Sequence, residues 1–334
     1  MNAREFSRLV AEKRVPSVLF FQGPEEYLKE AALSELRGAL LPEGLEDLNE
    51  TRLTAPETDE IISAAETMPF MADRRLLLLR DFPAVTGRGE ADEKLLAYLP
   101  NAPATAVILF YCVLPVKQKK IKNLVQKLGG LVDFTPLSDQ ELSSFVTQTF
   151  HSLGKECDAR TADFLVFTVG RDLNQLQTEI RKIAAYHPDQ PKLDPADVQA
   201  LATPSTESKV FAMVDAVVAG QADKAFLTLR NLLANGENPV MILSMLLRQY
   251  RLLQQVKILQ FEKKPASQIP SAMGLSGWAG SQYLRQAATY TGRQVREAVS
   301  FCLDTDLQVK SGLLRQDSAL EGLMLKLLLL RNSG

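Results

Sequence analysis

Short apolar runs alternate with amphipathic segments over residues 17–135. The apolar runs are rich in Leu, Val, Ile and Phe, and the segments between them have helical length. This alternation is typical of strand–helix–strand units whose helices cover both faces of a mainly parallel sheet. We therefore predict an α/β domain with strands near residues 17–22, 48–53, 75–80, 105–112 and 131–134, and with helices near residues 25–40, 57–67, 94–99 and 116–128.

The strand pattern stops after Phe134 and gives way to helical signals. Ser138 and Glu141 have the spacing of a capping box, in which each side chain satisfies a free amide of the first helical turn. Up to about residue 205 the chain is therefore predicted to form a small helical domain. Further helices are predicted to begin at Asp158, beyond the turn at residues 170–172, and at Asp194 before Pro195.

A polar, proline-containing segment at residues 203–208 is the best linker candidate in the second half of the chain. Beyond it, Asn238 and Pro239 begin a long helix that runs to about Phe261, and another helix covers residues 313–330. Both helices are apolar on more than one face, which favours either a central position in their domain or burial by a partner. The predicted domains are residues 1–135, 136–205 and 206–334.

The composition is that of an ordinary soluble globular protein, with 46% hydrophobic and 23% charged residues in 334. A formal net charge of −2 argues against a protein that coats nucleic acid, so any DNA contact should be local. The charged first segment lacks the apolar core of a signal peptide, and no apolar stretch reaches the roughly 20 residues of a membrane helix. We therefore expect a cytoplasmic protein without a membrane partner.

The cysteines and histidines do not form a recognisable metal or disulfide pattern. Cys112, Cys157 and Cys302 are isolated in the sequence, and His151 and His187 lie near no cluster with ligand spacing. We expect unreactive thiols, no metal site and no bound cofactor.

The turn after the first predicted strand lies where a P-loop NTPase holds phosphate. Against the pattern G-x-x-x-x-G-K-[ST], Gly23 and Lys29 match, but Leu28 replaces the second glycine. Glu30 replaces the hydroxyl that would bind Mg²⁺, and the acidic pair before Leu28 would repel an anion. We therefore predict that the loop does not bind ATP. The turn reads Gly23-Pro24-Glu25-Glu26-Tyr27-Leu28-Lys29-Glu30.

Two other interpretations of this region remain open. An ordinary helix start, with acidic residues favoured by the helix dipole, explains the same turn without any degenerate site. An active P-loop ATPase with an atypical loop is the functional alternative. Asp81, which follows the third predicted strand, is interpreted as a cap of the strand end rather than as a metal ligand.

A basic run and an apolar cluster are the remaining candidates for binding. Positioned lysines are sufficient to contact DNA phosphates, but a solvated helix face explains such a run equally well because no aromatic residues interleave with it. The apolar cluster at residues 68–71 lies between a helix and a strand, where a surface turn is usually polar. The alternative is that Phe70 caps the core. The basic run comprises Lys117, Lys119, Lys120, Lys122 and Lys127.

Taken together, these features resemble the bacterial clamp-loader delta subunits over nearly the whole chain. The resemblance rests on the order and spacing of loosely matching segments. It implies an AAA+-like (RecA-type) parallel-sheet domain with a degenerate P-loop, a small helical lid and a C-terminal helical-bundle collar. The matching segments are residues 23–28, 68–77, 132–142, 170–182 and 306–312.

The resemblance also implies a function in chromosome replication. Such a subunit has no catalysis of its own but belongs to the DNA polymerase III holoenzyme, a DNA-directed DNA polymerase. It binds and opens the beta sliding clamp on primed DNA while other subunits hydrolyse ATP. Its implied partners are the clamp and, through residues 206–334, loader subunits of the gamma/tau and delta-prime types. A helical scaffold unrelated to replication is the remaining alternative.

In these relatives a hydrophobic pair before the third strand enters a pocket of the clamp. The matching positions are Pro69, Phe70 and Met71. Phe70 fits the pattern, whereas Pro69 stands where relatives have Leu. We therefore expect Phe70 to be one anchor; the second is either Pro69 or Met71, and Met71 is favoured.

Overall fold

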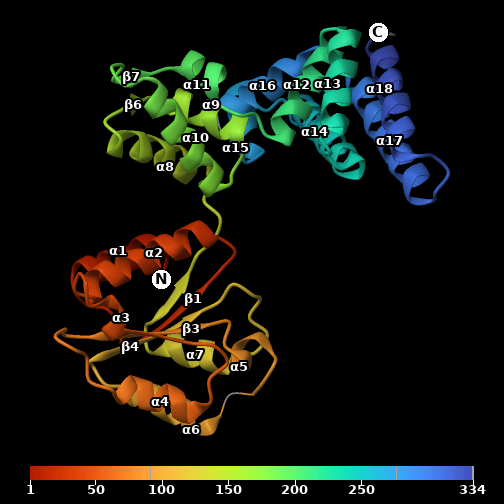
Figure 1. Ribbon diagram of the computed structural model, residues 1–334. Coiled ribbons are helices and arrows are strands. Elements are labelled where there is room, and N and C mark those ends of the chain that lie inside the picture. Colours follow the sequence, from red (N-terminus) through yellow and green to blue (C-terminus); the bar gives the residue numbers. More distant parts are fainter. Residues whose placement is uncertain (91, 276, 333–334) are drawn as a thin grey trace. The chain divides into compact units, whose positions relative to one another are not determined.

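The computed structural model describes residues 1–90, 92–275 and 277–332 of the chain. These residues divide into two compact units, Met1–Pro136 and Leu137–Gly334 (Figure 1). The first unit is built on five parallel strands in the order β2-β3-β4-β1-β5. All five predicted strands are confirmed, and they span β1 Val18–Gln22, β2 Glu50–Leu53, β3 Arg75–Arg80, β4 Ala106–Tyr111 and β5 Leu131–Asp133.

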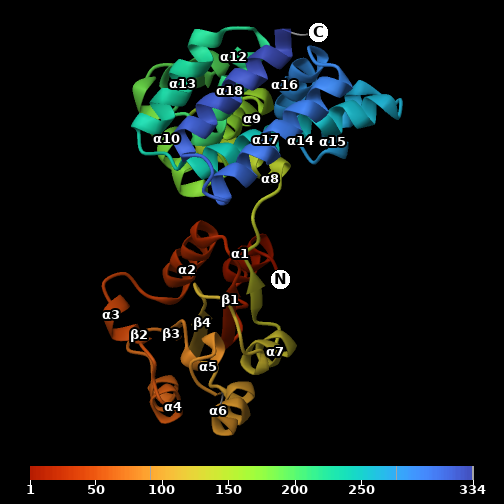
Figure 2. The same ribbon diagram turned by 90° about the vertical axis from the view of Figure 1, so that its right-hand side faces the viewer.

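Successive residues of the central strands point to opposite faces of the sheet and are buried on both. Phe20 and Phe110 contribute to one apolar cluster, whereas Phe21 contributes to the other. Helices therefore cover both faces (Figure 2). One face carries α1 Ala3–Ala11 and α2 Glu26–Leu40, and the other carries α4 Thr58–Glu66, α5 Pro83–Thr86, α6 Glu93–Tyr98 and α7 Lys120–Lys127.

Four helices of this unit differ from the sequence prediction, and the short α5 is one that was not predicted. Helix α1 was not predicted, although its strongly amphipathic pattern buries Phe6 and Val10. A short helix, α3 Glu46–Asn49, precedes β2 where a longer strand was predicted. Helix α7 begins at Lys120 rather than near residue 116, because the amides of Lys117 and Gln118 donate to the carbonyl of Val85 and hold that segment as a loop.

The second unit is almost entirely helical, and the capping residues predicted at Ser138, Asp158 and Asp194 are confirmed. The prediction that strands stop after Phe134 was wrong in one detail, because β6 Glu156–Cys157 and β7 Lys192–Leu193 pair in parallel. The helices are α8 Asp139–Ser152, α9 Ala159–Val169, α10 Leu173–Tyr186, α11 Pro195–Leu201, α12 Thr206–Val218, α13 Ala222–Ala234, α14 Pro239–Phe261, α15 Ile269–Ala272, α16 Gly277–Ala288, α17 Gly292–Lys310 and α18 Gln316–Asn332; short 3₁₀ turns span Leu99–Asn101 in the first unit and Ala266–Gln268 in the second.

The long helix α14 lies at the centre of the second unit. Its buried residues include Leu246, Tyr250 and Leu253, which join one apolar cluster with residues of α12, α13, α17 and α18. Phe167 of α9 packs its ring against Phe211 of α12 at 4.8 Å and against Trp278 of α16 at 4.4 Å. The helices on both sides of residue 205 thus share one compact unit, and the division of this unit into two domains stays a prediction.

Candidate functional site

The apolar segment Met68–Met71 lies between α4 and β3, and most of its side-chain surface is exposed. Phe70 is 53% exposed, Met71 is 78% exposed and Met68 is 72% exposed, whereas Pro69 is half-buried. A phenylalanine that capped the core would be buried, so the alternative interpretation of Phe70 as a core residue does not hold. The segment presents adjacent large apolar side chains to solvent.

The backbone of the same segment is held by buried polar groups. The amide of Phe70 donates to Oδ1 of Asn49 at 2.7 Å, and Nδ2 of Asn49 donates to the carbonyl of Phe70 at 2.9 Å. The buried Arg75 donates to the carbonyl of Thr67 at 3.2 Å and to the hydroxyl of Thr51 at 2.8 Å. The loop is therefore fixed at two points while its apolar side chains face outward.

Met71 adopts a left-handed backbone conformation with φ +48°. This region is sparsely populated by residues with a long side chain, and it persists where surrounding contacts determine it. The turn at Met71 directs the chain from the fixed Phe70 into β3. Met71 thus follows directly on the backbone that is hydrogen-bonded at Thr67 and Phe70.

The turn at residues 23–30 has a different character, because its lysine is buried and its partly exposed carboxylates Glu26 and Glu30 are paired within the protein. Gly23 has φ +112°, and a Cβ atom there would lie 2.2 Å from the carbonyl oxygen of Phe134. The position therefore requires glycine for close backbone packing. Lys29 is fully buried, and its Nζ donates to the carbonyl of Cys112 at 2.7 Å and forms an ion pair with Glu26.

Glu30, in the position of the Mg²⁺-binding hydroxyl, pairs with Arg80 at 2.6 Å and accepts the hydroxyl hydrogen of Tyr111 at 2.8 Å. Burial, together with the nearby carboxylate of Glu30, raises the pKa of Tyr111 well above its ordinary value. Arg80 also lies over the Tyr111 ring, 4.6 Å from its centroid. Leu28 packs half-buried against the apolar cluster beneath α1 and α2. The charges of this turn are thus engaged within the protein.

Asp81, directly after β3, accepts the amides of Val113 and Leu114, both at 2.8 Å. These contacts tie the end of β3 to the segment after β4, as the sequence interpretation of a strand-end cap requires. Among the described residues, no group of three or more His, Cys, Asp and Glu side chains could hold a metal ion.

The lysines of the basic run lie on α7 and in the loop before it. Lys117, Lys119, Lys120 and Lys127 are exposed, and Lys122 is half-buried. Ile121 and Val125 form the opposite, buried side of α7. Exposed lysines opposite a buried apolar side are compatible with both interpretations of the run, a DNA contact and a solvated helix face.

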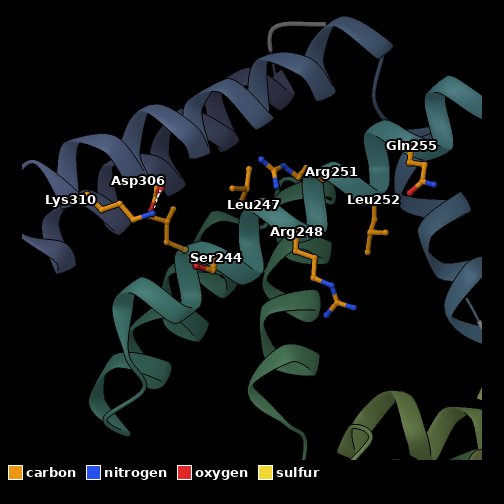
Figure 3. A pocket seen from close by; sticks show the side chains of 9 residues that line it. Ser244, Leu247, Arg248, Arg251, Leu252, Gln255, Asp306 and Lys310 are labelled. Carbon is orange, nitrogen blue, oxygen red and sulfur yellow. Dashed lines mark hydrogen bonds and ion pairs between the residues drawn. The ribbon is translucent and has the colours of Figure 1, made fainter. Parts of the chain in front are cut away.

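The second unit exposes apolar side chains in a regular pattern. Leucines recur four residues apart on the exposed sides of two neighbouring helices, which places each pair on one helical stripe. A groove of about 370 Å³ is lined by residues of α14 and α17. Helix α14 contributes Arg248 and Arg251, and α17 contributes Asp306 and Lys310, which form an ion pair at 2.7 Å (Figure 3). The exposed leucines are Leu303 and Leu307 on α17, and Leu325 and Leu329 on α18.

The thiols are poor nucleophiles. Burial raises the pKa of Cys112 and of Cys302 to about 12 and the pKa of Cys157 to about 11. A thiol with so high a pKa carries little thiolate at neutral pH. Within the described ranges, no helix combines the length and apolar character needed to cross a bilayer.

One functional candidate escaped the sequence analysis. Asn49 falls within the stretch predicted as the second strand, where an asparagine is unfavourable and could have drawn attention. Its partner Phe70 lies 21 residues further along the chain, so only the fold brings the two together.

Comparisons with known proteins agree over both units. Residues 19–132 match the family described as DNA polymerase III, delta subunit, and residues 207–327 match the DNA polymerase III delta subunit, C-terminal domain. The chain is 24% identical to DNA polymerase III subunit delta of Bacillus subtilis (strain 168), over 94% of this chain and 93% of that one. It is 25% identical to a probable DNA polymerase III subunit delta of Aquifex aeolicus (strain VF5), over 69% and 67% of the two chains.

A solved structure gives the same result for the fold. The Bacillus subtilis DNA clamp loader delta protein aligns with a TM-score of 0.57 and 22% identity, over 98% of this chain and 99% of that one. The predicted fold class, a parallel-sheet α/β domain followed by a mostly helical part, is confirmed. The sequence resemblance and both family matches lead to one assignment: the chain belongs to the DNA polymerase III delta subunit family, a component of the replicative polymerase and its clamp loader.

Proposed function

We propose that this chain binds the beta sliding clamp through Phe70 and Met71 and opens one interface of the ring in the bacterial cytoplasm. The observation that carries the proposal is the pair of exposed apolar side chains on a loop whose backbone is held from inside. A rigid apolar anchor is the usual core of a tight protein interface, because little conformational freedom is lost when it binds.

The chain leaves ATP hydrolysis to other subunits in this proposal. A phosphate-binding lysine must be free to reach the nucleotide, but Lys29 is buried against the Cys112 carbonyl and Glu26. Glu30 is likewise paired with Arg80. These contacts argue against the alternative of an active ATPase with an atypical loop.

The second unit supplies the contacts with loader subunits of the gamma/tau and delta-prime types. The exposed leucine pairs on α17 and α18, together with the groove beside α14, are surfaces that partner helices could bury. Primed DNA held by the assembled loader is the proposed ligand of Lys117, Lys119, Lys120 and Lys122, because the first three are exposed, Lys122 is half-buried beside them, and positioned ammonium groups suit phosphate contacts.

A ring-opening assay tests the proposal. The purified full-length chain is added, without nucleotide, to clamp labelled with a fluorophore on each side of one ring interface. Binding with an increased separation of the fluorophores is the expected result, since the binding energy of the anchor is available without ATP. Absence of binding, or binding that leaves the separation unchanged, would contradict it.

A further inference from the structure

Asn49 is a fully buried polar residue whose side chain binds backbone groups from two directions. Its Oδ1 accepts the amide of Phe70, and its Nδ2 donates to the carbonyls of Phe70 at 2.9 Å and Leu45 at 3.1 Å. Burying an amide is unfavourable unless its hydrogen-bonding groups are satisfied. Here the same bonds satisfy Asn49 and both polar groups of one anchor residue.

The position of Asn49 in the fold makes it a rigid support. It is the last residue of α3, and β2 begins at the next residue. Strand β2 pairs in register with β3, with Glu50 opposite Leu76. The Asn49 backbone thus continues directly into the edge strand β2, which Figure 2 shows beside α3.

We propose that Asn49 is a positioning residue for clamp binding. With both backbone polar atoms of Phe70 bonded to one buried side chain, the φ and ψ angles of Phe70 are restrained, and the side chain leaves the backbone from a fixed point on the exposed side of the loop. The loop is then ordered before the clamp arrives, which removes part of the entropy cost of binding. This inference rests on the proposed function of Phe70 and adds to it the residue that orients the anchor.

A double-mutant cycle tests the coupling. Clamp affinity is measured for the wild type, Asn49→Ala, Phe70→Ala and the double variant, at a temperature where all are folded. Asn49→Ala is expected to weaken binding by about 5- to 10-fold in the wild-type background and by less than about 2-fold in the Phe70→Ala background. Equal weakening in both backgrounds, or no weakening, would overturn the positioning role.

Two controls separate positioning from general stability. Val125→Ala removes buried volume from α7, away from the anchor loop, and is expected to lower the melting temperature without changing clamp affinity. Hydrogen exchange of the Phe70 amide in the free protein is expected to accelerate at least about 10-fold in Asn49→Ala relative to Val125→Ala. Unchanged Phe70 exchange would show that Asn49 does not hold the anchor.

If Asn49→Ala does not fold, Asn49→Ser replaces it in the experiment. The shorter serine side chain keeps a polar group in the site but cannot reach both the amide and the carbonyl of Phe70. For Asn49→Ser we again expect weaker clamp binding that depends on Phe70, and faster hydrogen exchange of the Phe70 amide. Failure of the proposed function has its own signature: Phe70→Ala would bind the clamp like the wild type, while the Phe70 amide would still lose protection in the Asn49 variant.

Discussion

The loop at residues 68–71 and the turn at residues 23–30 belong to the same unit but differ in which of their groups are bonded inside the protein and which face solvent. In the first, buried side chains hold the backbone and the apolar side chains face solvent. In the second, the chain packs against Phe134 and the charged side chains turn toward one another. The first arrangement leaves an apolar surface accessible and the second leaves no accessible lysine, which is why we propose the first as a binding surface and the second as a structural turn.

The largest effect is expected at Gly23, because its turn packs directly against the backbone of Phe134. Gly23→Ala combines an unfavourable positive φ with a clash against the Phe134 carbonyl. We expect a loss of about 3–5 kcal/mol in the free energy of unfolding, measured by urea denaturation. Gly38→Ala is the matched control, since a Cβ there meets nothing within 4 Å. It is expected to be neutral or slightly stabilising in a helix. Equal, small changes in the free energy of unfolding for both variants would contradict a structural role of the Gly23 turn.

A smaller change in stability is expected at Lys29. Lys29→Met removes the donor to the Cys112 carbonyl in a buried site, so unfolding should become easier by about 1–3 kcal/mol. Calorimetric titration with Mg-ATP should give no saturable heat for either protein. Stoichiometric heat in the wild type that disappears in Lys29→Met, with stability unchanged, would restore the active-ATPase alternative.

The smallest effects sharpen the description of the anchor loop itself. Met71→Ala is expected to weaken clamp binding by about 1–2 kcal/mol, because its exposed side chain lies beside Phe70. Pro69→Ala should change affinity by less than about 0.5 kcal/mol. Met68→Ala is the matched control, a similarly exposed methionine in the same loop. If Pro69→Ala costs more than Met71→Ala, the second anchor is Pro69.

The sequence predicted the central strands β3, β4 and β1 because each is an apolar run buried on both faces, whereas β2 at the sheet edge is largely polar and only partly buried. It also located the helix caps of the second unit, whose signals lie within four residues of one another. Helix α1 was not predicted, because Phe6 and Val10 alone form its buried side and the surrounding positions are mostly charged or polar. Local patterns were sufficient wherever the stabilising contacts are themselves local.

The candidate sites show where such patterns fail. The sequence predicted that Leu28 and Glu30 disfavour phosphate, but the carbonyl that Lys29 binds belongs to Cys112, 83 residues away. The apolar loop was found from its composition, yet its support by Asn49 and Arg75 depends on contacts made by the folded sheet edge. Hydrogen bonds between distant segments leave no spacing signal in a single sequence.

Phe70→Ala is the most direct test of the account. We expect clamp affinity to fall by about 2–4 kcal/mol, roughly 30- to 1,000-fold, while the melting temperature of the free protein changes little, because the ring is 53% exposed. Phe261→Ala, at a phenylalanine that is 90% exposed in the second unit, should change neither quantity. Normal clamp binding by Phe70→Ala together with a stability loss of about 3–5 kcal/mol, the value for a buried phenylalanine, would contradict the account.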